Sequence, residues 1–290
     1  ARPVSGISAG VGASPPQNPH RARSGQMPNN LSYENVTMRF EGRSGAVQAL
    51  DRFDFQVKSS EFLVIVGPSG CGKSTLLHLT AGLYKPPTGR ILLGGEEVRE
   101  PGPDKAIVFQ NFSLFPWKTV HDNIDFGLRI NGIPAAERED QIKRVIRLIG
   151  LDGFENHYPR QLSGGMQQRV AIARSFVLKP RTLLMDEPFA ALDAQNRQIM
   201  QEELVRIWQT QRPTVMFITH SVEEAVFLAD RVIVMTRRPG RVKEVIDIAN
   251  IAGDHHWRAD PFDEGIRRAA FQDVRSRIWG LVKSEISVRN

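Results

Sequence analysis

Two kinds of hydrophobic pattern alternate along the chain. Apolar and polar residues alternate at 31–40 and 52–57, which predicts half-buried antiparallel strands. Continuous apolar runs predict strands buried on both faces at 62–66, 106–110, 182–187, 214–219 and 231–236. Segments with helical spacing, such as 194–208 and 222–229, separate several of these runs. Strands that alternate with helices predict a mostly parallel α/β sheet.

Changes in this pattern divide the chain into three parts. Residues 1–30 are rich in Pro, Gly, Ser and Asn and predict a disordered tail; a transit peptide is disfavoured because the amphipathic pattern is missing. Residues 31–240 form the main domain, and only helices are predicted within an insertion at about 111–162. Residues 241–290 predict a packed C-terminal appendage, with a strand and then a helix that has Phe271, Val274, Ile278 and Leu281 on one face.

Composition limits the classes of function. The chain is 41% hydrophobic and 24% charged, as is typical of a globular protein, and its apolar runs are of strand length. The net charge of +6 lies at the ends: residues 1–30 carry three Arg and no acid, and residues 237–290 carry 11 Lys or Arg against 8 Asp or Glu. The remaining segment is therefore neutral, so we expect no nucleic-acid partner. The single cysteine excludes an internal disulfide. His255 and His256 lie in a polar segment and are interpreted as solvated rather than metal-binding.

The segment GPSGCGKS at 67–74 follows a buried strand and precedes a helix. Its glycines, Gly67, Gly70 and Gly72, let the loop wrap around a phosphate that faces backbone N–H groups and the helix dipole. Lys73 would neutralise phosphate charge, and the Ser74 hydroxyl would ligate Mg²⁺. Cys71 is interpreted as a small loop residue, with a side hypothesis that the helix start lowers its pKa and makes it sensitive to oxidation.

Four polar residues end other buried strands. Asp186 and Glu187 follow the run at 182–185; Asp186 is expected to hold Mg²⁺ and Glu187 to deprotonate water. Gln110 and His220 close the runs that begin at 106 and 214. Because parallel strands end at one edge of a sheet, we expect all four side chains to face the same phosphate.

A Ser-Gly-Gly turn precedes the helix that begins near residue 164. Ser163 alone is an ordinary N-cap, whereas Gly164 and Gly165 would also let an anion approach the helix N-terminus. Together with the phosphate loop upstream, this turn favours a second anion site.

Across residues 31–240 the sequence resembles the nucleotide-binding subunits of ABC transporters, with every motif in order. The segment 67–75 matches Walker A, Gln110 the Q-loop, LSGGM at 162–166 the signature, and LLMDE at 183–187 Walker B. Phe40 matches the aromatic that stacks on adenine, Asp193 ends the D-loop ALD, and His220 is the switch histidine. Met166 replaces the usual Gln of the signature, and Ser221 a frequent Asp.

The resemblance implies a P-loop NTPase (RecA-like) core with an antiparallel β subdomain and an α-helical insertion subdomain, and it implies ATP and Mg²⁺. It assigns catalysis to Glu187, His220 and Gln110, and Mg²⁺ to Ser74, Gln110 and Asp186. The expected ATP-binding residues are Phe40, Gly67, Pro68, Ser69, Gly70, Cys71, Gly72, Lys73, Ser74, Thr75, Ser163, Gly164, Gly165 and Asp193.

It also implies an assembly. Two ATPase subunits, expected to be a homodimer, pair head to tail so that the signature of one closes on the nucleotide held by Walker A of the other. Their partner is a transmembrane permease subunit, with a periplasmic or extracellular solute-binding protein involved indirectly. The expected location is peripheral, on the cytoplasmic face of the inner membrane.

Segments at 111–133 and 219–242 are similar to importers of the nitrate, sulfonate and taurine group. Phe112, Phe115 and Trp117 follow the Q-loop and are either the groove that receives the permease or the core of the helical insertion. Two further alternatives for function remain open: an ABC ATPase acting in DNA repair or translation, and a lipid-transport or exporter-type ATPase.

Overall fold

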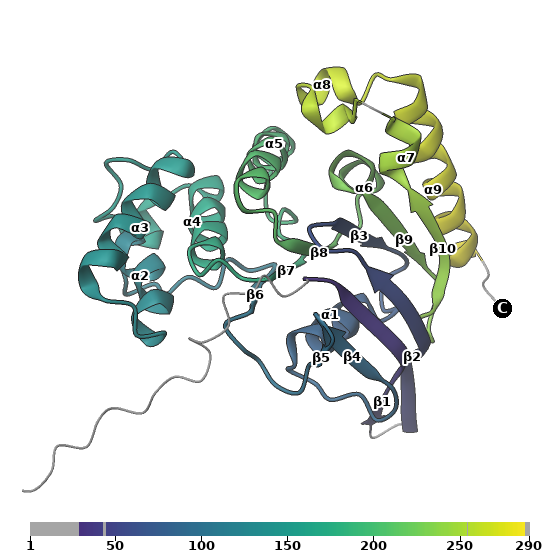
Figure 1. Cartoon of the computed structure of the whole chain (residues 1–290). Coiled ribbons are helices and arrows are strands. Elements are labelled where there is room, and N and C mark those ends of the chain that lie inside the picture. The colour runs from purple at the N-terminus through teal and green to yellow at the C-terminus, as the bar shows by residue number, and fades with distance from the viewer. Residues whose placement is uncertain (1–28, 43–44, 254, 288–290) are drawn as a thin grey trace, which may run out of the picture.

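The protein is described here by a computed structural model, which covers residues 29–42, 45–253 and 255–287. A six-stranded sheet forms its centre (Figure 1). In spatial order its strands are β10 (Val242–Asp247), β9 (Arg231–Met235), β3 (Phe62–Val66), β8 (Thr214–Ile218), β7 (Thr182–Asp186) and β6 (Lys105–Val108). The strands from β9 to β6 run parallel, and β10 is antiparallel to β9. The predicted mostly parallel sheet is confirmed.

A second, antiparallel sheet packs over one face of the first. Its order is β2 (Gly45–Val57), β1 (Leu31–Gly42), β4 (Arg90–Leu93) and β5 (Glu96–Glu97). Helix α1 (Lys73–Ala81) shares one hydrophobic cluster with both sheets, to which β3 contributes Leu63 and Ile65. This cluster fixes the position of the helix that follows the glycine-rich loop.

The alternate residues of β3, Phe62, Val64 and Val66, face a larger cluster on the opposite side of the parallel sheet. The helices of that side are α4 (Gly164–Phe176), α5 (Ala194–Gln211), α6 (Val222–Leu228) and α9 (Ala269–Ser287). Because β3 is buried on both faces, its five residues are all apolar, as its sequence indicated.

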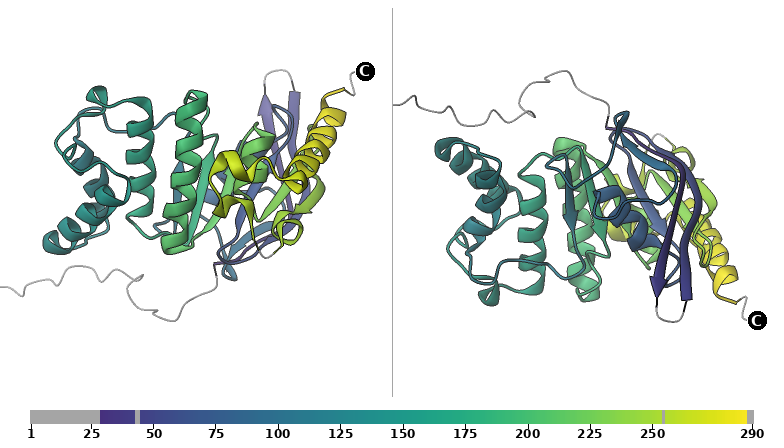
Figure 2. Two further views of the ribbon diagram at one scale, coloured as in Figure 1. Left: turned by 90° about the horizontal axis from the view of Figure 1, so that it is seen from above. Right: turned by 90° about the horizontal axis from the view of Figure 1, so that it is seen from below.

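Within the predicted insertion at about 111–162 the structure has α2 (Val120–Ile130), α3 (Ala135–Leu148) and a 3₁₀ turn η2 (Pro159–Gln161), and α4 follows directly after it. Figure 2 shows these helices as a lobe on one side of the sheets, with α9 on the opposite side. Asn123 of α2 is fully buried: its Oδ1 accepts from Phe115 N at 2.8 Å and its Nδ2 donates to the carbonyls of Phe115, Lys118 and Thr119. One side chain thereby fixes the loop that follows the Q-loop.

After β10 the chain forms α7 (Ile248–Ala252), η3 (Trp257–Ala259), α8 (Phe262–Gly265) and α9. Phe271, Val274 and Ile278 of α9 are buried as expected, whereas Leu281 is only partly buried and Val282 takes the fourth core position. An 11-residue step from 271 to 282 is close to three whole helical turns, so Val282 lies more directly over the first buried residue than Leu281 does.

Of the predicted tail, residues 1–28 lie outside the described residues. Asn29 is fixed at the amino ends of the parallel strands. Its N–H donates to Ser59 Oγ at 2.8 Å, its carbonyl accepts from Thr214 Oγ1 at 2.7 Å, and its Oδ1 accepts from Arg181 Nε at 3.2 Å. The chain therefore enters the fold at this edge of the sheet.

Candidate nucleotide-binding and hydrolysis site

Four neighbouring parallel strands bring the predicted residues to one edge. In the order β3, β8, β7 and β6, the strands lead into the glycine-rich loop, His220, Asp186 with Glu187, and Gln110. Since these strands run parallel, their carboxyl ends lie side by side, as the sequence predicted.

The glycine-rich loop has a conformation that requires its glycines. Gly70 and Gly72 have φ of 74° and 105°, in the left-handed region, and a Cβ on Gly72 would lie 2.8 Å from the Ala49 carbonyl oxygen. The Lys73 side chain folds back over the loop, and its Nζ donates to the carbonyls of Gly67 at 2.8 Å and Pro68 at 3.0 Å. The ammonium group is thus held inside the loop that would surround a phosphate.

The other residues of this loop differ in exposure. Gly67 is buried, and Pro68 and Thr75 are half-buried; the residues open to solvent are Ser69, Gly70 and Ser74. An exposed Ser74 hydroxyl at the helix start is free of packing constraints and fits the predicted metal-ligand role.

Cys71 does not behave as the side hypothesis proposed. Its side chain is buried, and burial raises the pKa of the thiol, even though Lys73 lies close enough to lower it. Lys73 Nζ is 3.8 Å from Cys71 Sγ. Loss of water contact outweighs this neighbouring charge, so the predicted lowering of the Cys71 pKa is wrong.

Glu187 and His220 meet directly. Glu187 Oε1 lies 2.5 Å from His220 Nε2, and the Glu187 N–H donates to the Ile218 carbonyl at 3.0 Å. Glu187 has φ of 47°, a left-handed conformation that is uncommon for a non-glycine residue and is found at functional sites. The two side chains, which follow β7 and β8, contact each other directly at the ends of neighbouring strands.

Asp186 has an oxygen that fits a cation. Its Oδ1 is buried and receives no hydrogen bond from the described part of the chain. A buried carboxylate oxygen without a partner is costly unless a ligand satisfies it, and Mg²⁺ prefers such oxygens. The geometry is therefore compatible with the expected metal at the end of β7.

Sequence inspection missed Glu224, which links two parts of the site. This buried carboxylate accepts from Thr219 Oγ1, next to His220, and lies 3.7 Å from Arg197 Nε. Arg197 Nη2 in turn donates to the Leu192 carbonyl, one residue before Asp193, at 3.0 Å. Burial raises the pKa of Glu224. A signal was present, since Glu224 stands three residues after the N-cap Ser221, the spacing of a capping box.

Ser221 accepts from the Glu224 N–H at 3.2 Å and caps α6, so the replacement of the frequent Asp retains the capping function. Asp193 caps α5 in the same way, accepting from the Asn196 N–H at 3.0 Å. Hydrogen bonds from Asn196 lower the pKa of Asp193, so its carboxylate is charged at neutral pH.

The signature turn is formed as a helix N-terminus. Ser163 Oγ accepts from the Met166 N–H at 3.3 Å, and Met166 packs against the larger hydrophobic cluster. A Cβ on Gly164 or Gly165 would meet its nearest atoms at 3.7 and 3.6 Å, which is ordinary contact. The packing of this chain therefore does not require these glycines. Helix α4 packs into the larger cluster and α1 into the cluster on the opposite face of the sheet, so the signature turn and the glycine-rich loop begin helices of different layers.

Phe40 of β1 is 37% exposed and is suited to stacking on a ligand. Its ring packs edge-to-face against Tyr84 at 5.7 Å, and Tyr84 packs in the same way against His78 of α1 at 5.4 Å. An aromatic row thus leads from the antiparallel sheet to the helix of the glycine-rich loop.

The aromatics after Gln110 divide into two groups. Phe115 is half-buried and packs against Phe126 at 4.5 Å and under the Arg174 guanidinium at 5.5 Å, and Phe112 packs against the larger cluster. Trp117 is 71% exposed. The core interpretation therefore holds for Phe112, whereas Phe115 is half-buried beside Phe126 and Trp117 presents its ring to solvent.

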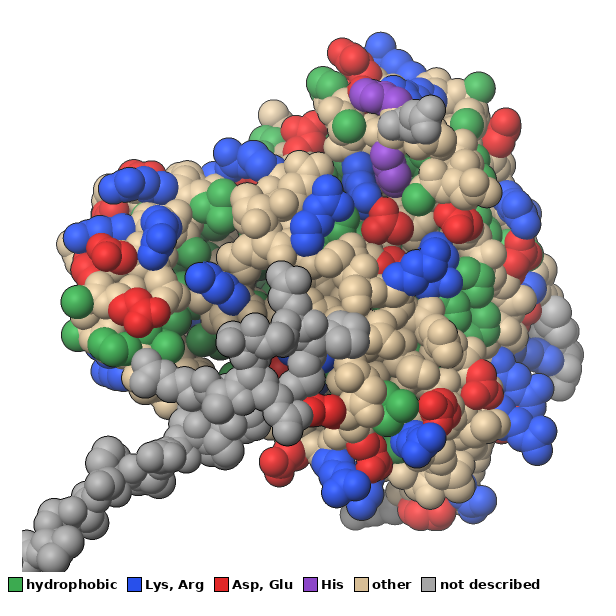
Figure 3. Space-filling view, viewed as in Figure 1, with side chains coloured by type: hydrophobic (Ala, Val, Ile, Leu, Met, Phe, Trp, Pro, Cys, Tyr) green, Lys and Arg blue, Asp and Glu red, His purple; other side chains and the backbone are tan. Residues whose placement is uncertain are grey.

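The two adjacent histidines also differ. His255 is exposed and pairs with Asp260 at 2.7 Å, whereas His256 is half-buried with Nε2 at 3.0 Å from the Ala229 carbonyl. The solvated interpretation is thus wrong for His256. Among the described residues, no group of three or more His, Cys, Asp and Glu side chains is arranged to hold a metal. On the face drawn in Figure 3, acidic and basic side chains are interspersed rather than separated by sign.

Comparison with known proteins agrees with this geometry. A family model described as "ABC transporter" matches residues 50–190. An uncharacterized ABC transporter ATP-binding protein of Methanocaldococcus jannaschii is 56% identical over 218 residues, covering 75% of this chain and 82% of that protein. A nitrate import ATP-binding protein of Synechocystis is 48% identical over 225 residues, with coverage of 78% and 84%.

A taurine import ATP-binding protein of Rhizobium johnstonii is 48% identical over 219 residues, with coverage of 75% of this chain and 84% of that protein. Among solved structures, a dimeric ATP-binding cassette bound to ADP and Pi superposes with a TM-score of 0.66 at 30% identity, covering 76% of this chain and 99% of that one.

Proposed function

This chain belongs to the ATP-binding proteins of ABC transporters, and on that premise we propose that it is the ATP-hydrolysing subunit of an importer that acts through a separate transmembrane permease. The observation that carries this proposal is the convergence of Lys73, Asp186, Glu187 and His220 at the carboxyl ends of three neighbouring strands.

Each side chain has a role that its surroundings support. Lys73, held inside the glycine-rich loop, neutralises the β- and γ-phosphates. Glu187 orients and deprotonates the attacking water. His220, whose Nε2 lies 2.5 Å from Glu187 Oε1, fixes the Glu187 carboxylate and faces the γ-phosphate. Ser74, Gln110 and Asp186 hold Mg²⁺, which supplies charge neutralisation on the phosphates when bound. Phe40 stacks on the adenine.

The signature turn completes the site of a second copy. Ser163, Gly164 and Gly165 present unpaired N–H groups of α4, and the space beside both glycines lets a γ-phosphate approach the backbone. Because the similar ATP-binding cassette bound to ADP and Pi is a dimer, we infer that two copies of this chain pair head to tail and enclose two ATP molecules.

The permease is proposed to dock beside Trp117. Its exposed indole lies next to Phe115, with ring centroids 5.7 Å apart, in the loop fixed by Asn123. In the described part of the chain, every helix is too short or too polar to cross a bilayer. Attachment to the cytoplasmic face of the membrane is therefore proposed to come from this docking.

The solute is of the nitrate, sulfonate or taurine type. Relatives with equal identity carry names for nitrate import and for taurine import, so the similarity of the ATP-binding chain does not distinguish between these two solutes. A solute-binding protein outside the membrane would select the solute and act on this chain only through the permease.

The test is reconstitution with a permease and a solute-binding protein of the nitrate, sulfonate or taurine type. We expect the complex in vesicles to hydrolyse ATP faster when the solute-binding protein and its solute are supplied outside. If the rate of hydrolysis did not change when the solute-binding protein and its solute were added, or if this chain and the permease did not assemble, the importer function would be contradicted. Either result would favour an ABC ATPase of another class. A variant lacking the general base, Glu187→Gln, is the control for contaminating ATPases.

A further inference from the structure

Helix α6 begins directly after the His220–Ser221 pair, and the C-terminal segment holds its other end. We propose that His256, Trp257 and Arg258, here named the clasp, position His220 for ATP hydrolysis by fixing α6. This inference rests on the proposed role of His220 and adds residues that do not themselves touch the nucleotide site.

The clasp binds the last carbonyl groups of α6. Trp257 Nε1 donates to the Val226 carbonyl at 2.7 Å, and Arg258 Nη1 donates to the Leu228 carbonyl at 2.7 Å. His256 Nε2 is 3.0 Å from the Ala229 carbonyl. Carbonyls at a helix C-terminus have no partner within the helix, so three consecutive side chains satisfy groups that would otherwise remain unpaired.

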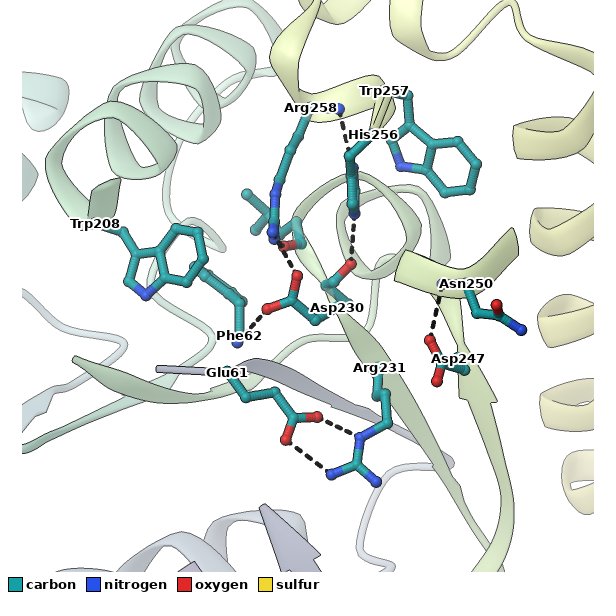
Figure 4. A network of polar contacts seen from close by, with 12 residues as sticks. Glu61, Phe62, Trp208, Asp230, Arg231, Asp247, Asn250, His256, Trp257 and Arg258 are labelled. Carbon is teal, nitrogen blue, oxygen red and sulfur yellow. Dashed lines mark hydrogen bonds and ion pairs between the residues drawn. The ribbon is translucent and has the colours of Figure 1, made fainter. Parts of the chain in front are cut away.

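Other elements fix the clasp itself. Trp257 is 1% exposed and packs edge-to-face against Phe271 of α9 at 5.3 Å. Arg258 stacks over Trp208 of α5 at 4.8 Å and pairs with Asp230, whose other oxygen accepts from the Phe62 N–H at 2.8 Å. Figure 4 shows Arg258 reaching from the C-terminal segment to Asp230. The clasp is therefore anchored to α5, α9 and the start of β3.

The amino end of α6 carries the segment with His220. Glu224, in the first turn, bonds Thr219 on one side of His220, and its N–H bonds Ser221 on the other. Helix α6 has only seven residues, about 10 Å in length. A short rigid helix transmits a displacement of its carboxyl end to its amino end, so loosening the clasp moves His220 relative to Glu187.

The alternative is that the clasp is a structural anchor without influence on hydrolysis. Two variants separate these roles. Arg258→Met keeps a long apolar side chain but loses the guanidinium group that stacks over Trp208 and bonds Leu228 and Asp230. Trp257→Phe removes the donor to Val226 while leaving an aromatic ring. The matched control is Arg277→Met on α9, which breaks an ion pair with Glu244 of β10 that does not involve α6.

We expect both clasp variants to lower the kcat of ATP hydrolysis about tenfold with KM for ATP unchanged, because misplacement of a catalytic side chain by a fraction of an ångström has effects of this size. The imidazole NMR signal of His220, assigned by its loss in His220→Gln, should shift in both variants and remain unchanged in Arg277→Met. If Arg258→Met does not fold, Trp257→Phe decides the outcome.

If the clasp variants lowered the thermal midpoint but left kcat and the His220 signal unchanged, the proposal would be overturned. The clasp would then be a structural anchor without influence on hydrolysis. If the wild-type chain does not hydrolyse ATP, the proposed function fails, whereas the His220 signal still tests the clasp because it needs no activity.

Discussion

Lys73 and Glu187 illustrate two ways in which a residue acquires a role from its position. Lys73 begins a helix and bends back over the loop before it, where two carbonyl oxygens hold its ammonium group. Glu187 follows a buried strand in a left-handed conformation that directs its carboxylate toward His220. The first side chain is suited to binding charge and the second to moving a proton.

We therefore expect Lys73→Ala to lose most affinity for ATP, since the phosphates lose their principal cation. Glu187→Gln should retain the affinity and slow hydrolysis by about 10²–10⁴, the usual contribution of a positioned general base. Equilibrium binding of a fluorescent ATP analogue and steady-state hydrolysis measure the two effects. Equal loss of binding in both variants would show that Glu187 has been assigned the wrong role.

A second prediction at this scale concerns pH. Burial, and then the charge of Arg258, lower the pKa of His256 from 6.5 to about 4; Asp230 opposes this change and Arg268 reinforces it. The folded state thus binds fewer protons than the unfolded state between these values. Above pH 6.5 His256 is neutral in both states and does not lower the free energy of unfolding. As the pH falls from 6.5 toward 4, protons bind His256 in the unfolded state first, so the free energy of unfolding decreases.

At pH 5 the loss from this one group is at most about 2 kcal/mol. Urea unfolding at pH 7.5 and pH 5 should show a larger decrease for the wild type than for His256→Gln, whose amide can still donate to Ala229. Parallel decreases in the two proteins would mean that His256 does not titrate in this range.

The positions of residues at strand ends could be predicted from the sequence, whereas pairs formed by residues far apart in the chain could not. Gln110, Asp186, Glu187 and His220 each follow an apolar run, which marks their position in the fold. Arg258 gives no comparable signal, because its partners Asp230 and Leu228 lie 28 and 30 residues away and meet it only in the folded chain.

At the scale of elements, the buried strands were the easiest to predict. Strands β3, β7 and β8 are continuous apolar runs, and their bounds agree with the sequence to within one residue. The hairpin of β1 and β2 extends further than its period-2 pattern, because register shifts between Gln48 and Phe53 interrupt the alternation of β2. Strand β4 was not predicted, since Arg90–Leu93 is too short for a pattern.

At this scale we make a prediction for Trp117, which lies in the loop after Gln110. Trp117→Ala should leave ATP binding and the thermal midpoint of the free chain almost unchanged, because the ring is 71% exposed. Assembly with the permease should weaken by about 2 kcal/mol or more, the usual effect of a large aromatic at an interface centre.

The measurements are thermal unfolding of the free chain and transport per ATP in reconstituted vesicles. Asn123→Ala is a useful contrast, since it removes four hydrogen bonds to the loop and should lower the thermal midpoint. Normal assembly and transport in Trp117→Ala would place the permease elsewhere.

At the scale of the whole molecule, the glycine-rich loop and the signature turn begin helices on opposite faces of the parallel sheet. In the proposed pair of copies, the signature turn of one would lie against the glycine-rich loop of the other. The motif order predicted this composite site only through the family resemblance, because sequence spacing does not indicate which face of a sheet a helix covers.

We expect the Glu187→Gln chain to form dimers when ATP and Mg²⁺ are present and monomers without them. Sedimentation velocity measures the two species. Adding Gly164→Ala should abolish the dimer without lowering the thermal midpoint, because a Cβ there meets its nearest atom in the same chain at 3.7 Å but occupies the space of the partner's phosphate. Persistent monomers with ATP demonstrably bound would contradict the paired arrangement.

The three hydrogen bonds of Asn29 have a practical consequence for handling this protein. They tie the start of the described chain to Ser59, Arg181 and Thr214, beside the first residues of β3, β7 and β8. The nucleotide edge is at the opposite ends of these strands. We therefore expect an affinity handle or fluorescent protein joined directly to Asn29 to lie at the edge of the sheet opposite the proposed nucleotide site, five strand residues away.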